Sequence, residues 1–200
     1  MVSKVNVRIK ATLLFFAVIN IHLPLTADES VTPYQNKVIE FDQMVVPGSK
    51  NYQKNWKRMT GFEYSGLHWD QFVVVYTNKG DAVYKHNFLE YSAWFDDPDD
   101  EDNEPVYKKY PEGTTFVKEN YKITKGKPGD FDSATVMIKR YAGFDPDGGN
   151  WEYMQFDRKG KLILRGNAGN KLVNTTCANC HTNVDQRDFI FSNIFSGSSK

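Results

Sequence analysis

Apolar, β-branched and aromatic residues recur in short runs along this chain, separated by clusters rich in Gly, Pro, Asp and Lys. Residues 69–78 (WDQFVVVYTN) are typical of a buried strand, because Val, Phe and Tyr dominate them. Three later runs share this character and are predicted as strands: 114–124, 134–141 and 151–157. A turn then leads into a last segment of the same kind, 161–164.

One segment has a helical pattern instead. Residues 80–95 carry apolar or aromatic side chains at spacings that favour an amphipathic helix. These side chains are Val83, Phe88, Leu89, Tyr91 and Trp94. An acidic run broken by proline follows at 96–102; such a run can dock a basic redox partner or bind calcium weakly, and more often is a solvated loop. The expected fold class is mainly β (α+β), an antiparallel sheet with a few helices.

Composition narrows the class of protein without indicating a function. The 200 residues suffice for one domain, and 40% hydrophobic with 25% charged residues fit an ordinary globular chain. The aromatic content of 14% suits a β-rich core or a pocket lined with flat rings. Lys and Arg balance Asp and Glu at 25 each, and no basic stripe stands out, so we expect no nucleic-acid partner.

The N-terminal 27 residues have the character of a signal peptide. Lys4, Arg8 and Lys10 form a positive region, residues 11–21 form an apolar run, and Ala27 offers a small residue for cleavage. The apolar run is too short to span a bilayer, which needs about 20 residues. An uncleaved interfacial anchor is the alternative. We therefore predict a signal peptide at 1–27, one domain at 28–200 and a periplasmic location.

The two cysteines of the chain, Cys177 and Cys180, are followed directly by His181. This C-x-x-C-H spacing is the attachment signature of c-type haem. The two thiols add to the haem vinyl groups, and the adjoining histidine then lies under the iron as an axial ligand. We predict that Cys177 and Cys180 anchor one covalently attached haem c near the C-terminus and that His181 binds its iron.

Other uses of two cysteines compete with haem. A disulfide between them closes a very small loop and stabilises little. A thioredoxin-like C-x-x-C belongs near the start of a βαβ unit, whereas this one stands near the end of the chain. A zinc site needs two further ligands, and the mature chain offers only His68 and His86 besides His181.

The position of the motif bears on the sixth ligand of the iron. Small cytochromes c supply a methionine far downstream of the motif, but no methionine lies among the 200 − 181 = 19 residues after His181. Four methionines lie upstream and can in principle reach the iron, although such residues more often fill a core: Met44, Met59, Met137 and Met154. The sequence thus favours five-coordinate iron with an open face, which suits ligand binding more than electron transfer.

Several segments, taken in order, resemble the cytochrome P-460 family, which also includes the β-sheet cytochromes c′. The resemblance runs from about Phe72 to Phe195. Its marks are 75–78 (VYTN), 110–114 (YPEGT), 117–119 (VKE), 135–140 (TVMIKR), 149–151 (GNW) and 188–191 (DFIF). The resemblance implies a mainly antiparallel β fold around one haem, commonly as a homodimer.

Members of the P-460 type carry a bond from a lysine amine to a meso carbon of the porphyrin, and the resemblance implies Lys118 for that lysine. On a strand Phe116, Lys118 and Asn120 share one face, and a lysine that faces inward is costly unless it is used. The alternative is that Lys118 points to solvent. The distal carboxylate and arginine of the family correspond to Thr135 and to a position near Val73, so we expect a more apolar pocket.

The resemblance implies a mono-haem c-type cytochrome that oxidises hydroxylamine to nitrous oxide or nitric oxide, or binds nitric oxide at an open iron. A soluble electron-transfer cytochrome is the expected redox partner. The alternative is a non-enzymatic protein, either a c′-like gas binder or an electron-transfer cytochrome c. A methionine bound as sixth ligand distinguishes electron transfer, and an open iron without a cross-link distinguishes the gas binder.

Overall fold

The computed structural model describes residues 39–68 and 70–196. All of them fall within one compact unit of the chain. The predicted signal peptide at 1–27 lies outside the described residues. Within the two described ranges, no helix is both long and apolar enough to cross a membrane.

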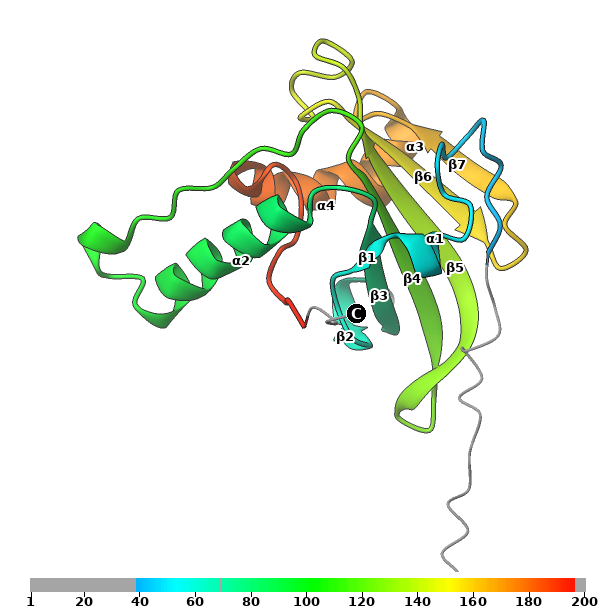
Figure 1. Cartoon of the computed structure of the whole chain (residues 1–200), viewed down its shortest axis with the longest axis horizontal. Helices are drawn as coiled ribbons and strands as arrows, with labels where there is room; N and C mark the ends of the chain where they lie inside the picture. Colours follow the sequence, from blue (N-terminus) through cyan, green and yellow to red (C-terminus); the bar gives the residue numbers. More distant parts are fainter. Residues whose placement is uncertain (1–38, 69, 197–200) are drawn as a thin grey trace, which may run out of the picture. The chain divides into compact units, whose positions relative to one another are not determined.

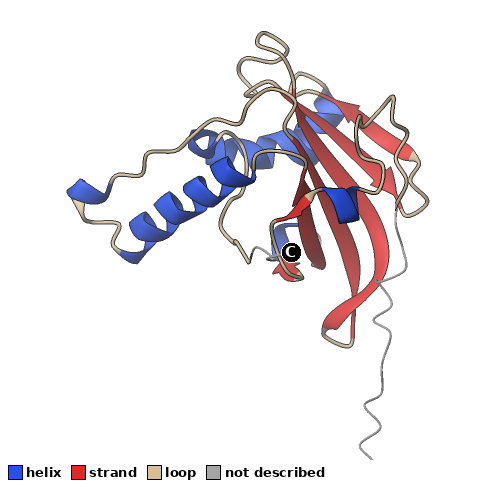
Figure 2. Ribbon diagram, in the orientation of Figure 1, coloured by secondary structure: helices blue, strands red, loops and turns tan. Residues whose placement is uncertain are grey.

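The fold is built on one sheet of seven antiparallel strands, which confirms the predicted class (Figures 1 and 2). The strands are β1 (Lys57–Arg58), β2 (Glu63–Ser65), β3 (Gln71–Thr77), β4 (Thr115–Thr124), β5 (Lys127–Lys139), β6 (Trp151–Asp157) and β7 (Leu162–Gly166). Their order across the sheet is β1-β3-β4-β5-β6-β7, and β2 also pairs with β3. Strands adjacent in the chain from β3 to β7 are therefore adjacent in the sheet.

The hairpin between β4 and β5 closes in a tight turn. Its two turn residues, Lys125 and Gly126, have φ values of 52° and 74°. Positive φ at both central positions is what a tight two-residue hairpin requires, because its twist then matches that of the strands. The hairpin lets β5 begin at Lys127, seven residues before the predicted strand at 134–141.

The helical segments are short except for one. They are α1 (Tyr52–Asn55), η1 (Gly66–His68), α2 (Asp81–Asp96), η2 (Glu101–Asn103), α3 (Lys171–Val173), η3 (Asn174–Ala178), α4 (Asn179–His181) and η4 (Thr182–Arg187). The 16-residue α2 confirms the predicted helix at 80–95. Its buried side chains are Tyr84 and Asn87, whereas Leu89 is 54% exposed, so the expected apolar stripe is buried only in part.

Side chains alternate between the two faces of the sheet and build two separate cores. On one face Tyr52 of α1 packs with Tyr76, Val117 and Tyr121. On the other face a second cluster joins the sheet to α2 and the C-terminal helical segments. That second cluster includes Tyr84, Phe116, Met137, Tyr153, Val173 and Ala178. The candidate functional site lies on this second face.

Candidate functional site

A pocket opens between the second face of the sheet, the first turn of α2, η1 and the C-terminal helical segments. It holds about 930 Å³ of empty space, its open mouth included. Small-molecule sites are commonly concave and mostly apolar. The walls here include Val75, Phe116, Met137, Ile190 and Phe191, with a small number of polar groups among them.

One row of the sheet forms the floor of this pocket. Val75, Lys118, Thr135 and Gln155 are successive cross-strand partners on β3, β4, β5 and β6. All four line the pocket, and each is half-buried between fully buried neighbours of its own strand. The exposure repeats from strand to strand because residues that face each other across a ladder share one side of the sheet. Lys118 and Thr135 therefore stand side by side at the pocket.

The amine of Lys118 lies in surroundings that disfavour its charge. Burial lowers the pKa of Lys118 to about 7, and the nearby Cys177 and Cys180 partly oppose that shift. Within the described part of the chain, Lys118 makes no side-chain hydrogen bond and no ion pair. A large share of these amines is therefore neutral at pH 7, and a neutral amine is the nucleophilic form.

The opposite wall carries the C-x-x-C-H motif. Asn170 caps α3 by accepting the backbone N–H groups of Leu172 and Val173, which starts the helical segment. Cys177, Cys180 and His181 follow at spacings of three and four residues, which place them on one side of a helix. All three line the pocket, and both cysteines are free thiols.

The ring of His181 is held in one tautomer. Its Nδ1 lies 2.7 Å from the backbone oxygen of Phe189. A carbonyl oxygen only accepts, so Nδ1 carries the proton and Nε2 keeps a free lone pair. Tyr153 and Phe191 pack edge-on against the ring, with centroids 5.6 Å and 5.2 Å away. Burial lowers the pKa of His181 to about 4, which keeps the imidazole neutral, as a metal ligand must be.

The remaining histidines have different surroundings. His68 lines the pocket and its Nδ1 lies 2.7 Å from the hydroxyl oxygen of Ser65. Burial lowers the pKa of His68 to about 3, with Lys118 and His181 as further causes. His86 lies elsewhere, 2.8 Å from the backbone oxygen of Val106. Across the described residues, no group of three His, Cys, Asp or Glu side chains could hold a metal ion, so the zinc alternative gains no support.

Some of the methionines and distal positions line the pocket, and others lie away from it. Met137 and Met154 line the pocket, while Met44 is 87% exposed. Thr135, where the resemblance implied a carboxylate, borders the pocket, but Val73 is not among the lining residues. Sequence reasoning missed Gln155 and Tyr153. The only sequence signal for these two residues was that side chains along 151–157 alternate between the two faces of the sheet. That signal shows which of them face the pocket only once the register with β5 is known.

A sequence profile of the cytochrome P460 family matches residues 49–192 of the chain. The chain belongs to the cytochrome P460 family. No curated protein matches it. The matched range contains the pocket floor and the whole C-x-x-C-H motif, so the family expectation of a c-type haem falls on the residues described above.

The residues of the pocket fit such a group. Two free thiols and a histidine with an available Nε2 face the same space, which is the donor set of a c-type haem. The apolar walls suit the face of a porphyrin. The hydroxyl of Tyr153 is buried at the pocket without a hydrogen-bond partner among the described residues. An unpaired buried hydroxyl costs about 1–3 kcal/mol, so a bound group with acceptor atoms would satisfy it.

Proposed function

We propose that this protein is a periplasmic mono-haem c-type cytochrome that oxidises hydroxylamine. Cys177 and Cys180 would anchor the haem, and His181 would bind its iron through Nε2. The haem would supply a redox-active iron with one face open to substrate. The observation that carries the proposal is that the amine of Lys118 shares one pocket with all three residues of the motif.

Lys118 is proposed to bond a meso carbon of the porphyrin. Bond formation replaces one N–H of the amine and the meso C–H by an N–C bond, and two protons and two electrons leave to an oxidant such as a peroxide. The neutral amine that this step needs is available, since the pKa of Lys118 is about 7. The lack of a competing hydrogen bond or ion pair within the described structure leaves the amine free to react.

The reaction balances as two hydroxylamines giving nitrous oxide, water, four protons and four electrons; the product nitric oxide corresponds to three protons and three electrons per hydroxylamine. A soluble electron-transfer cytochrome is the proposed acceptor, and a homodimer the proposed state. Thr135 and Gln155 supply neutral hydrogen-bonding groups at the floor, and Phe116 and Met137 limit the access of water.

A c′-like gas binder is the second candidate, and a specific residue favours it. Thr135 stands beside Lys118 where the resemblance implied a carboxylate, so a hydroxyl, which is a poor base, takes the place of the expected proton acceptor. Nitric oxide binding needs no such group. The two candidates therefore differ in whether Lys118 is bonded and hydroxylamine is consumed.

The deciding experiment is the absorption spectrum of the ferrous protein, matured with periplasmic haem attachment, beside Lys118→Ala. The matched control is Lys122→Ala, because Lys122 lies on the same strand but is exposed and paired with Asp132 at 3.3 Å. A strongly red-shifted ferrous band in wild type and control that disappears in Lys118→Ala supports the cross-link. An ordinary high-spin c-type spectrum in all three proteins contradicts it and leaves the gas binder.

A further inference from the structure

The carbonyl that holds His181 belongs to an unusual turn. Asp188 and Phe189 both adopt the left-handed conformation, with φ values of 55° and 65°. Each non-glycine residue in that region costs about 1–2 kcal/mol. Two in succession persist only where the surroundings over-determine the backbone, and such places are concentrated at functional sites. The turn exposes the oxygen of Phe189 to Nδ1 of His181 at 2.7 Å.

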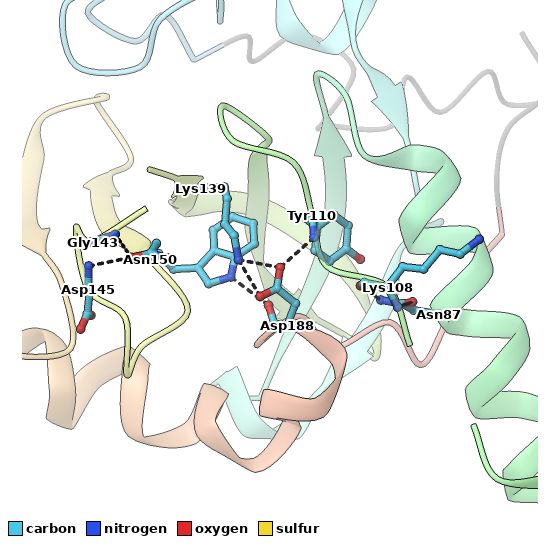
Figure 3. A network of polar contacts seen from close by, with 9 residues as sticks. Asn87, Lys108, Tyr110, Lys139, Gly143, Asp145, Asn150 and Asp188 are labelled. Atoms are coloured by element: carbon cyan, nitrogen blue, oxygen red, sulfur yellow. Dashed lines mark hydrogen bonds and ion pairs between the residues drawn. The ribbon is translucent and has the colours of Figure 1, made fainter. Parts of the chain in front are cut away.

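Asp188 anchors this turn from within the protein. Its carboxylate is 3% exposed and accepts Lys139 Nζ at 2.6 Å through both oxygens, together with the backbone N–H of Tyr110 at 2.8 Å (Figure 3). Its backbone oxygen accepts the indole N–H of Trp151 at 2.8 Å. Buried carboxylates need such partners, because an unpaired one is strongly destabilising. Side-chain and main-chain atoms of Asp188 are thus both fixed.

The turn is also shaped by a close approach. A Cβ added to Gly149 would lie 2.5 Å from the ring of Phe189, so only glycine leaves room for that ring. Asn150 keeps the neighbouring loop in place by accepting the N–H groups of Gly143 and Asp145 (Figure 3). Four segments that mark the family in this sequence therefore meet at one turn: 110–114, 135–140, 149–151 and 188–191.

We propose that Asp188 is a positioning residue for the haem iron: anchored by Lys139, Tyr110 and Trp151, it fixes the Phe189 carbonyl on Nδ1 of His181. This inference rests on the ligation of iron by His181, which is part of the proposed function, but it does not depend on the Lys118 cross-link.

The expected effect follows from the direction of the hydrogen bond. A carbonyl that accepts the Nδ1 proton firmly makes the imidazole more basic at Nε2, and groups that hydrogen-bond a metal ligand in this way tune the metal site. A more basic axial ligand donates more charge to the iron and favours the ferric state. Loosening the turn weakens this donation, so it raises the reduction potential and weakens the iron–histidine bond.

Three substitutions test this in the haem-bearing protein. Lys139→Gln removes a positive charge, Asp188→Asn removes a negative charge, and Trp151→Phe removes the indole N–H, with part of the ring, without changing the charge. The reduction potential is measured by spectroelectrochemical titration, and the iron–histidine stretching frequency of the ferrous protein by resonance Raman spectroscopy. The matched control is Asp185→Asn, because Asp185 lies in η4, which ends just before Asp188, but is exposed and accepts the N–H of Gln186.

All three variants are expected to raise the potential and lower the stretching frequency, while the control leaves both unchanged. The ferric–ferrous equilibrium should shift about tenfold, which is about 59 mV for a one-electron couple. Potentials that move in opposite directions for Lys139→Gln and Asp188→Asn, with no change in Trp151→Phe, would show that charge alone acts and would overturn the proposal. Lower thermal stability with an unchanged potential and frequency would overturn it as well.

If Lys139→Gln does not mature, the other two variants still test the proposal. An effect of charge alone would change the reduction potential of Asp188→Asn and leave that of Trp151→Phe unchanged. A failure of the proposed function looks different. A wild-type protein without covalently bound haem contradicts the ligation by His181, and an ordinary ferrous spectrum contradicts only the cross-link.

Discussion

Lys118 and Glu119 are neighbours in β4, yet their side chains lie on opposite faces of the sheet and differ in their hydrogen bonding. Glu119 is 1% exposed, and its carboxylate accepts hydrogen bonds from the hydroxyls of Tyr52 and Tyr121, the latter at 2.7 Å, and from the amide of Gln53. The side chain of Lys118 faces the pocket and has no hydrogen bond or ion pair among the described residues.

The difference separates polar groups that stabilise the fold from polar groups that face the pocket. A structural carboxylate in a core needs hydrogen-bond donors from the same chain, since burial without them is costly. The pocket floor shows the reverse: Lys118, Thr135 and Gln155 lie together without side-chain hydrogen bonds in the described ranges. Such a row, with its polar groups open to the pocket, is expected where a bound group completes the site.

The largest expected effect comes from deleting one long polar side chain from each face. Glu119→Ala should lower the free energy of unfolding by about 3–5 kcal/mol, because it leaves a cavity and removes the carboxylate that accepts from two buried tyrosine hydroxyls. Gln155→Ala, matched in side-chain length on the pocket face, should change it by less than about 1 kcal/mol. Urea denaturation of the purified variants measures both values. Equal losses would remove the distinction between the faces.

Much of the sheet follows from local sequence. The strand at 151–157 matches β6 residue for residue, and β3, β4 and α2 lie within two residues of their predicted ends, because β-branched runs and turn residues act locally. The elements β1, β2, α1 and η1 gave no such signal. Each has two to four residues and depends on tertiary contacts, such as the packing of Tyr52 in the core.

The site likewise has one part that follows from local sequence and another that depends on tertiary structure. The C-x-x-C-H motif is local, so the sequence predicted the residues at 177, 180 and 181 directly. The pocket floor depends on register across four strands, and the partner of His181 is a main-chain oxygen eight residues away. No side-chain pattern in the sequence reveals which carbonyl a folded turn presents to His181.

A smaller effect on stability is expected when a single hydroxyl is removed from each face of the sheet. Tyr121→Phe removes one donor to Glu119 and should destabilise the protein by about 1.5–3 kcal/mol, because the bond is made to a charged or partly charged group. Thr135→Val removes a pocket-facing hydroxyl with no hydrogen bond in the described part of the chain and keeps the side-chain shape. It should cost less than about 0.5 kcal/mol. A larger cost for Thr135→Val than for Tyr121→Phe would contradict the comparison.

The smallest expected effect is a pH dependence on the core face. Burial raises the pKa of Glu119 above its ordinary value of 4.5, although the hydrogen bonds from Tyr52, Tyr121 and Gln53 oppose that shift. A raised pKa means that the folded state binds the proton more tightly than the unfolded state. The contribution of Glu119 to stability is therefore greatest below pH 4.5 and declines as the pH rises through its folded pKa.

Glu119→Gln abolishes this titration while keeping groups that can pair with the same neighbours. Unfolding free energies of wild type and variant, measured by urea denaturation from pH 4 to about 8, should therefore diverge in favour of the variant as the pH rises. Glu112→Gln, an exposed carboxyl outside both cores, serves as the control and should run parallel to wild type. A difference for Glu119→Gln that stays constant with pH would mean that its carboxyl binds the proton equally in both states. The hydrogen bonds to Glu119 would then fully offset its burial, and the core face would accommodate a charge at no cost.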